Sequence, residues 1–79
     1  MMARILVAED DDAMRVFLEK ALSRAGHEVS ALANGEAAAS CAELEEYDLL
    51  VTDVKMPGLD GIDLARRIVA RSPNLGVIF

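Results

Sequence analysis

The chain has 79 residues, of which 53% are apolar and 28% are charged. This length allows one domain, residues 1–79, and the composition is that of a folded globular protein. The net charge of −6 argues against partners such as nucleic acid or an anionic membrane surface. Since no apolar run reaches the ~20 residues of a membrane-spanning helix and nothing resembles a signal peptide, we expect a cytoplasmic protein.

The first third of the chain predicts a strand followed by a helix. Residues 5–8 are uniformly apolar, which is typical of a strand buried on both faces of a parallel sheet. Apolar residues then recur at spacings of three and four, which predicts a helix with Phe17, Leu18 and Leu22 in the core. Either Asp11 or Asp12 can cap its start.

The middle of the chain repeats this alternation. Gly26 is expected to end the first helix, and residues 27–32 to form a second strand. Asn34 and Gly35 read as a turn, followed by an alanine-rich helix over residues 36–46.

The last part of the chain predicts a third strand, a third helix and the start of a fourth strand. The third strand, residues 49–52, is followed at once by Asp53, and Asp60 is expected to cap the next helix. Residues 76–79 read as the beginning of the fourth strand. The inner stripe of the third helix is predicted to contain Ile62, Ala65, Ile68 and Val69.

Strictly alternating strands and helices predict a parallel sheet with helices on both faces. Ligands of such sheets bind at the carboxyl ends of the strands. If the first and third strands are neighbours, Glu9, Asp10 and Asp53 meet in one cleft. Three carboxylates packed together repel one another, so either some of them are protonated or a cation binds. An all-oxygen site with room for water suits Mg²⁺.

A carboxylate beside a bound metal ion can attack phosphorus and become an aspartyl phosphate. Asp53 is the better nucleophile because it stands alone at the end of its strand. Glu9 and Asp10 are adjacent and can hold the ion directly or through water.

Two segments of the sequence resemble the signatures of the response-regulator receiver domains of two-component systems, the CheY-like superfamily. They are ILVAEDDD at 5–12 and DLLVTDVKMPGLDG at 48–61. The second is specific, because Met-Pro follows the aspartate by three residues and Asp-Gly follows the proline by three. The resemblance implies a flavodoxin-like, doubly wound parallel α/β sheet with strand order 2-1-3-4. Within the family, residues 8–22 look most similar to the small stand-alone receivers of alphaproteobacteria called CpdR.

The resemblance also implies roles for individual residues. Asp53 would be the phosphoacceptor, and Mg²⁺ would be held by Glu9, Asp10, Asp53 and the backbone carbonyl of Lys55. The phosphodonor would be a sensor histidine kinase or a histidine phosphotransfer protein, and a downstream protein target would read the signal. The domain would be a switch rather than an enzyme, catalysing only its own phosphoryl transfer and autodephosphorylation. The loop beside the site would contain Met56, Pro57, Asp60 and Gly61.

The resemblance covers only part of a receiver domain. We expect the final helix-strand-helix portion to be absent, so the Thr or Ser and the Lys that contact the phosphoryl group would lie beyond Phe79. Either the chain ends there or the molecule is longer. A protein ending at that point would dimerise, swap elements or aggregate through an exposed edge. That edge would consist of Val77, Ile78 and Phe79.

Two other functions compete with the phosphorylation switch. One is a phosphatase with an aspartate nucleophile and Mg²⁺, but such enzymes carry a second aspartate two residues after the nucleophile, where this chain has Lys55. The other is a receiver-like interaction module that is never phosphorylated, against which the intact acidic triad argues.

Overall fold

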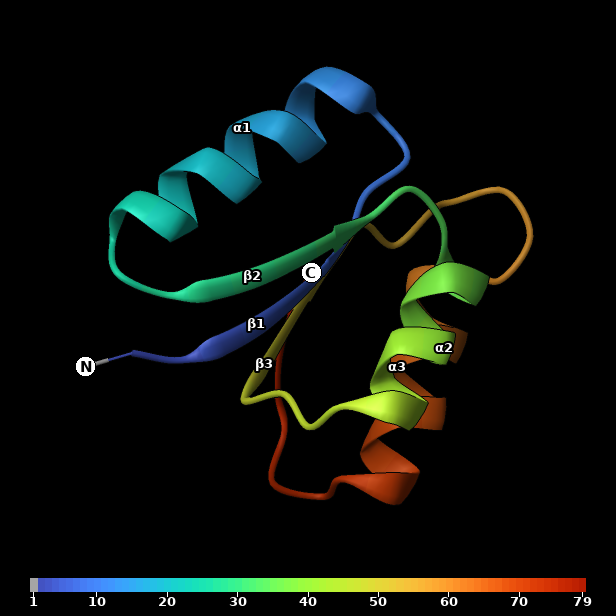
Figure 1. The fold of residues 1–79 in the computed structure, drawn as a ribbon. Helices are drawn as coiled ribbons and strands as arrows, with labels where there is room; N and C mark the ends of the chain where they lie inside the picture. Colours follow the sequence, from blue (N-terminus) through green and yellow to red (C-terminus); the bar gives the residue numbers. More distant parts are fainter. Residues whose placement is uncertain (1) are drawn as a thin grey trace.

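The computed structural model describes residues 2–79 and contains three helices and four strands in strict alternation (Figure 1). No helix in this part of the chain is long and apolar enough to cross a membrane. The alternation of strands and helices is the one that the sequence predicted. In chain order the elements are β1 (Arg4–Ala8), α1 (Asp12–Arg24), β2 (Glu28–Leu32), α2 (Gly35–Leu44), β3 (Leu49–Thr52), α3 (Gly61–Arg71) and β4 (Gly76–Ile78).

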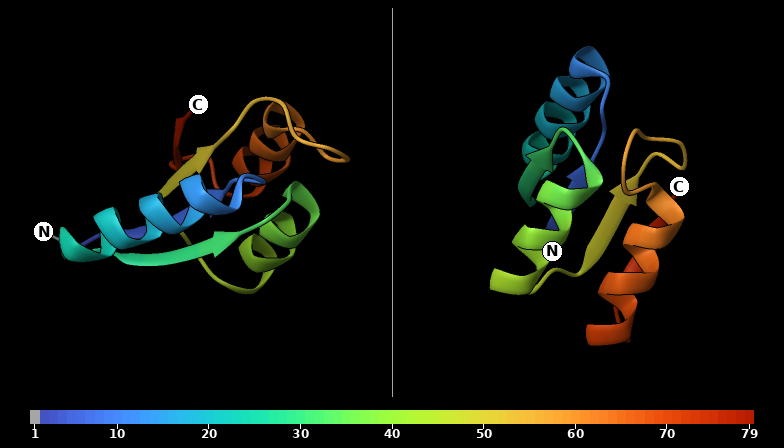
Figure 2. Two further views of the ribbon diagram at one scale, coloured as in Figure 1. Left: turned by 90° about the horizontal axis from the view of Figure 1, so that it is seen from above. Right: turned by 90° about the vertical axis from the view of Figure 1, so that its right-hand side faces the viewer.

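The four strands form one parallel sheet in the order β2-β1-β3-β4. Helix α1 covers one face of the sheet, and α2 and α3 cover the other (Figures 1 and 2). The flavodoxin-like, doubly wound arrangement with order 2-1-3-4 is thus confirmed. The central strand β1 has neighbours on both sides and its residues 5–8 are buried, as its uniformly apolar sequence predicted.

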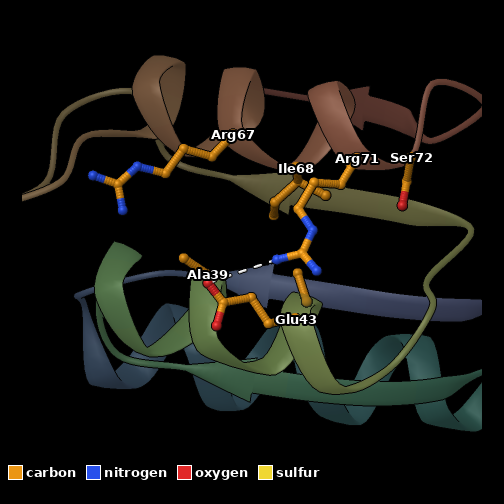
Figure 3. A pocket seen from close by; sticks show the side chains of 7 residues that line it. Ala39, Glu43, Arg67, Ile68, Arg71 and Ser72 are labelled. Carbon is orange, nitrogen blue, oxygen red and sulfur yellow. Dashed lines mark ion pairs between the residues drawn. The ribbon is translucent and has the colours of Figure 1, made fainter.

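The main core lies between the sheet and the pair α2 and α3. Leu6 and Leu50 point from the sheet into this layer and are fully buried, as are Ala38 of α2 and Leu64 of α3. Small alanine side chains on α2 let the two helices approach each other. Between the helices is a shallow hollow lined by Ala39, Ile68, Arg67 and Arg71, with an ion pair of 3.8 Å between Arg71 and Glu43 at its edge (Figure 3).

The predicted inner stripes of two helices need correction. Phe17 was expected in the core, yet it is 64% exposed; Leu18 and Leu22 of the same helix are half-buried. In α3, Ile62 and Val69 are exposed, while Leu64 is fully buried. Each misplaced residue is one position away from a buried or half-buried one, which turns its side chain by about 100° around the helix. Apolar spacing alone did not fix which edge of the stripe faces the sheet.

Polar side chains define where the helices begin. Asp11, one of the two expected caps, accepts a hydrogen bond from the backbone N–H of Met14 at 3.1 Å and starts α1. Asp60 caps α3 as predicted, with its carboxylate 2.9 Å from the backbone nitrogen of Asp63. Asn34 does the same for α2, so the expected turn at Asn34 and Gly35 is the start of that helix.

Candidate metal centre

The parallel register brings the predicted acidic residues together. Ala8 of β1 pairs with Thr52 of β3, so Glu9 and Asp53 follow at matching positions on adjacent strands. The backbone N–H of Asp53 donates to the carbonyl of Ala8 at 3.2 Å, which extends the ladder to this point. Asp10 is next in the loop between β1 and α1. The side chains therefore converge because β1 and β3 are neighbours. From the sequence alone, the adjacency of these two strands could only be assumed.

One carboxylate oxygen from each of Glu9, Asp10 and Asp53 lies within 4.8 Å of the others. Glu9 is buried, with 9% of its surface exposed, whereas Asp10 and Asp53 are exposed. The Glu9 carboxylate accepts a hydrogen bond from the backbone N–H of Asp11 at 3.1 Å. Within residues 2–79, none of the three carboxylates forms an ion pair with a basic side chain. Their mutual repulsion thus favours an external cation.

The donor set suits Mg²⁺. This ion takes oxygen ligands at ~2.1 Å, so two ligands on opposite sides of it are ~4.2 Å apart. The carboxylate oxygens of Glu9, Asp10 and Asp53 are spaced closely enough for small side-chain movements to reach that separation. Two of the three side chains are also open to solvent, which leaves room for the water ligands that Mg²⁺ retains. These residues could hold the ion.

Two neighbouring residues, Thr52 and Gly61, hold the backbone carbonyl of Asp53 in place. The buried hydroxyl of Thr52 donates to the carbonyl of Asp53 at 3.0 Å. Gly61 lies directly against the same carbonyl, and a Cβ atom at this position would overlap it. The first turn of α3 can approach β3 this closely because residue 61 has no side chain. Asp53 therefore presents its carboxylate from a rigid strand end, as a functional group requires.

The remaining predicted site residues lie in the loop from Asp53 to α3 and at the start of that helix. Met56 is 7% exposed and joins the core cluster, while Lys55 and Pro57 are exposed. The backbone N–H of Gly61 donates to the carbonyl of Val54 at 2.9 Å and closes the loop. The structure thus brings Glu9, Asp10 and Asp53 together. It places Lys55, Met56 and Pro57 in the adjoining loop, Asp60 at the N-cap of α3 and Gly61 as the first residue of that helix. The role of the Lys55 carbonyl as a ligand remains a prediction.

Sequence reasoning missed two charged residues that support these loops. The guanidinium of Arg15 donates to the carbonyl of Glu9 at 2.9 Å and also pairs with Asp12. Glu36, at the start of α2, accepts a hydrogen bond from the backbone N–H of Leu59 at 2.6 Å. The spacing of three between Asp12 and Arg15 was a usable signal, because such residues are neighbours on a helix. For Glu36 the sequence offered only a favourable charge at a helix start.

Fold and acidic cluster together define a class of protein. The chain belongs to the response regulator receiver domain family, whose model matches residues 5–79. This confirms the resemblance carried by the two signatures. Domains of this family are generally signalling domains rather than enzymes, and the family as a whole fits phosphorylation-based signalling.

Individual relatives agree with this assignment. The chain is 49% identical over 78 residues to the response regulator receiver protein CpdR of Brucella abortus, with 99% of this chain and 65% of that protein aligned. The solved structure of TrrA from Thermotoga maritima in complex with Mg²⁺-BeF has a TM-score of 0.89 and 33% identity, covering 96% of this chain and 66% of that one. In the complex of histidine kinase ThkA with TrrA, the similar chain has a TM-score of 0.85 and 32% identity, at 94% and 64% coverage. The chain therefore spans about two thirds of the length of these relatives.

Proposed function

We propose that this chain is a phosphorylation switch that accepts a phosphoryl group on Asp53 with the help of Mg²⁺. The observation that carries the proposal is the convergence of Glu9, Asp10 and Asp53 at the carboxyl ends of β1 and β3 in a member of the receiver family. TrrA, which is similar in structure, has been solved with Mg²⁺-BeF, which supports the same ion here. The ion would be held by these three carboxylates and by the carbonyl of Lys55.

The chemistry assigned to Asp53 is a group transfer. A carboxylate oxygen of Asp53 attacks the phosphorus of a phosphohistidine, an O–P bond forms, and the N–P bond breaks. The electron pair of the broken bond stays on the imidazole nitrogen, which takes up a proton. Bound Mg²⁺ would offset negative charge on the phosphoryl oxygens. Attack of water on the aspartyl phosphate then releases inorganic phosphate and restores the carboxylate.

The donor would be a sensor histidine kinase or a histidine phosphotransfer protein, and the site would be located in the cytoplasm. The complex of ThkA with the similar protein TrrA supports a kinase partner. The resemblance to receiver domains implies that the first helix, with Met14, Arg15 and Leu18 near its start, is part of the docking surface. Of these, Met14 is exposed, whereas Arg15 is engaged with Glu9 and Asp12 and Leu18 is half-buried. Met14 and the exposed Phe17, one turn further along α1, would be the most accessible apolar side chains of that surface.

Intact-mass spectrometry after incubation with acetyl phosphate tests the phosphoryl transfer. We expect a gain of about 80 Da, one phosphoryl group, that requires Mg²⁺. The Asp53→Ala variant should show no gain. A protein that binds Mg²⁺ but takes up no phosphoryl group would instead be an interaction module. Turnover of a generic phosphate ester would indicate a phosphatase.

We also propose that the 79-residue chain self-associates through β4. This strand lies at one edge of the described sheet, and Ile78 and the following Phe79 are 53% and 61% exposed. Val77 was expected to be exposed with them, but it is half-buried because it packs against the core. An apolar edge strand is a template for pairing with a second chain. Sedimentation of this chain and of Ile78→Lys measures the effect. A monomeric chain, or an Ile78→Lys variant that associates equally well, would contradict the proposal.

A further inference from the structure

A carboxylate from another part of the chain holds the loop that follows Asp53. The Glu36 carboxylate, in the first turn of α2, accepts a hydrogen bond from the backbone N–H of Leu59 at 2.6 Å. The two residues are 23 positions apart in the sequence. Figure 1 shows the loop between β3 and α3 passing beside the start of α2. Because the acceptor is charged, the bond is stronger than one between neutral groups.

Two glycines make space for this contact. Gly58 has φ of +78°, and a Cβ atom there would lie 2.8 Å from Oε2 of Glu36. Gly35 lies directly against the carbonyl of Leu59, and a Cβ atom there would overlap it. The start of α2 can approach the loop backbone only because position 35 has no side chain, and the positive φ at position 58 favours glycine. Both glycines therefore shape the loop at the point where the exposed Glu36 side chain reaches it.

The contact completes the attachment of the loop. The loop is closed at its base by the hydrogen bond between Gly61 and Val54, and its middle is held by the buried side chain of Met56. Glu36 fixes the far end at Leu59. Lys55 lies within the segment that these three attachments restrain. Its backbone carbonyl is the expected fourth protein ligand of the cation.

We propose that Glu36 is a positioning residue for the cation site: by holding Leu59, it keeps the Lys55 carbonyl in place relative to Asp53. This inference rests on the proposed function, since it assumes that the site binds Mg²⁺. A ligand that is already in place costs less to order when the ion binds. Residues that orient metal ligands typically change affinity by about 10–100-fold when removed. Glu36 acts on one backbone ligand of several, so the lower end of that range applies.

The test compares Glu36→Ala with Glu36→Gln in the whole protein, by Mg²⁺ titration and by hydrogen exchange of the Leu59 amide. Both variants remove the same charge, but glutamine keeps an oxygen that can accept from Leu59. We expect faster exchange at Leu59 and about tenfold weaker Mg²⁺ binding in Glu36→Ala. Glu36→Gln should remain closer to the wild type in both measurements. Glu19→Ala, an exposed acidic site on α1, controls for the general loss of a negative charge.

A second measurement guards against a folding defect in Glu36→Ala. Amide exchange in the central strands β1 and β3 should match the wild type, so that faster exchange is confined to Leu59 and its loop. Equal Mg²⁺ affinity in Glu36→Ala and the wild type would overturn the role of Glu36 while leaving the proposed function intact. Equal weakening by the alanine and glutamine variants would assign the effect to charge and also overturn it. A wild type that binds no Mg²⁺ would overturn the proposed function itself, and the cation role of Glu36 with it.

Discussion

Acidic side chains cluster at both ends of the sheet, but only those at the amino end have a basic partner among the described residues. At the carboxyl end, Glu9, Asp10 and Asp53 converge, and no basic side chain of residues 2–79 pairs with them. At the amino end, Arg4 lies among several acids. Its guanidinium pairs with Glu28 at 3.2 Å and with Glu45 at 3.3 Å.

The amino end adds further internal partners. The backbone N–H of Arg4 donates to the Asp48 carboxylate at 2.8 Å, and the Arg4 guanidinium lies 5.9 Å from the centre of the Tyr47 ring. The Tyr47 hydroxyl bonds to both Ser30 and Glu45. Acidic residues that pair with a basic residue of the same chain link the strands to one another. Acidic residues without such a partner can bind an external cation. An acidic cluster thus indicates a cation site only where the fold supplies no counter-charge.

The largest contrast should come from the glycines at the two ends. In Gly61→Ala the new methyl group meets the backbone carbonyl of Asp53, which cannot move without disturbing β3. We expect a loss of about 2–4 kcal/mol in the free energy of unfolding. In Gly76→Ala the nearest atom is Cδ1 of Leu49 at 3.2 Å, a side chain that can rotate. Urea unfolding should therefore show a loss below about 1 kcal/mol for that variant. Equal losses would mean that the carboxyl end is packed no more tightly than the amino end.

A pair of charge-matched variants tests the opposite uses of acidic residues. Asp10→Asn removes one carboxylate of the cluster, so Mg²⁺ affinity should fall by more than about tenfold. Without Mg²⁺ the same change relieves repulsion and should raise the unfolding free energy by up to about 1 kcal/mol. Asp48→Asn weakens the hydrogen bond from the Arg4 backbone and should lower the free energy of unfolding by about 1 kcal/mol. Its Mg²⁺ affinity should equal that of the wild type.

Mg²⁺ titration and urea unfolding of both variants decide this point. The comparison fails if Asp48→Asn weakens Mg²⁺ binding as much as Asp10→Asn does. That result would show that the ion responds to net charge and not to the cluster.

The smallest expected effect is a pH dependence at the amino end. Burial raises the pKa of Tyr47 above its ordinary value of 10.0; the hydrogen bond with Ser30 opposes this shift in part, and the bond to Glu45 adds to it. The folded protein therefore keeps the phenol proton at a pH where the unfolded chain has begun to lose it. This contribution to stability is complete below pH ~10 and is lost as pH rises through the raised pKa.

Thermal unfolding of the wild type and of Tyr47→Phe across that pH range measures the effect. The variant loses the hydrogen bonds of the hydroxyl and should be less stable at neutral pH by about 1 kcal/mol. The difference from the wild type should shrink above pH ~10. A constant difference across the range would show that Tyr47 does not titrate differently in the two states.

The sequence by itself determined the class of fold and the residues of the acidic cluster. A uniformly apolar strand such as 5–8 predicts its own burial on both faces. A capping residue such as Asp60 indicates a helix start because its hydrogen bond is local. The two signatures identified the family and, with it, the strand order. These features depend on residues close together in the chain, which is why they can be read from it.

Only the tertiary structure decided which helix faces are buried and what supports the site. Phe17 and Ile62 fit an apolar period but face outward, because burial depends on how the helix is rotated against the sheet. The hydrogen bond from Leu59 to Glu36 joins segments 23 residues apart. No local pattern reports such a contact, since it exists only once the sheet has formed and the loop after β3 lies beside the start of α2, which follows β2.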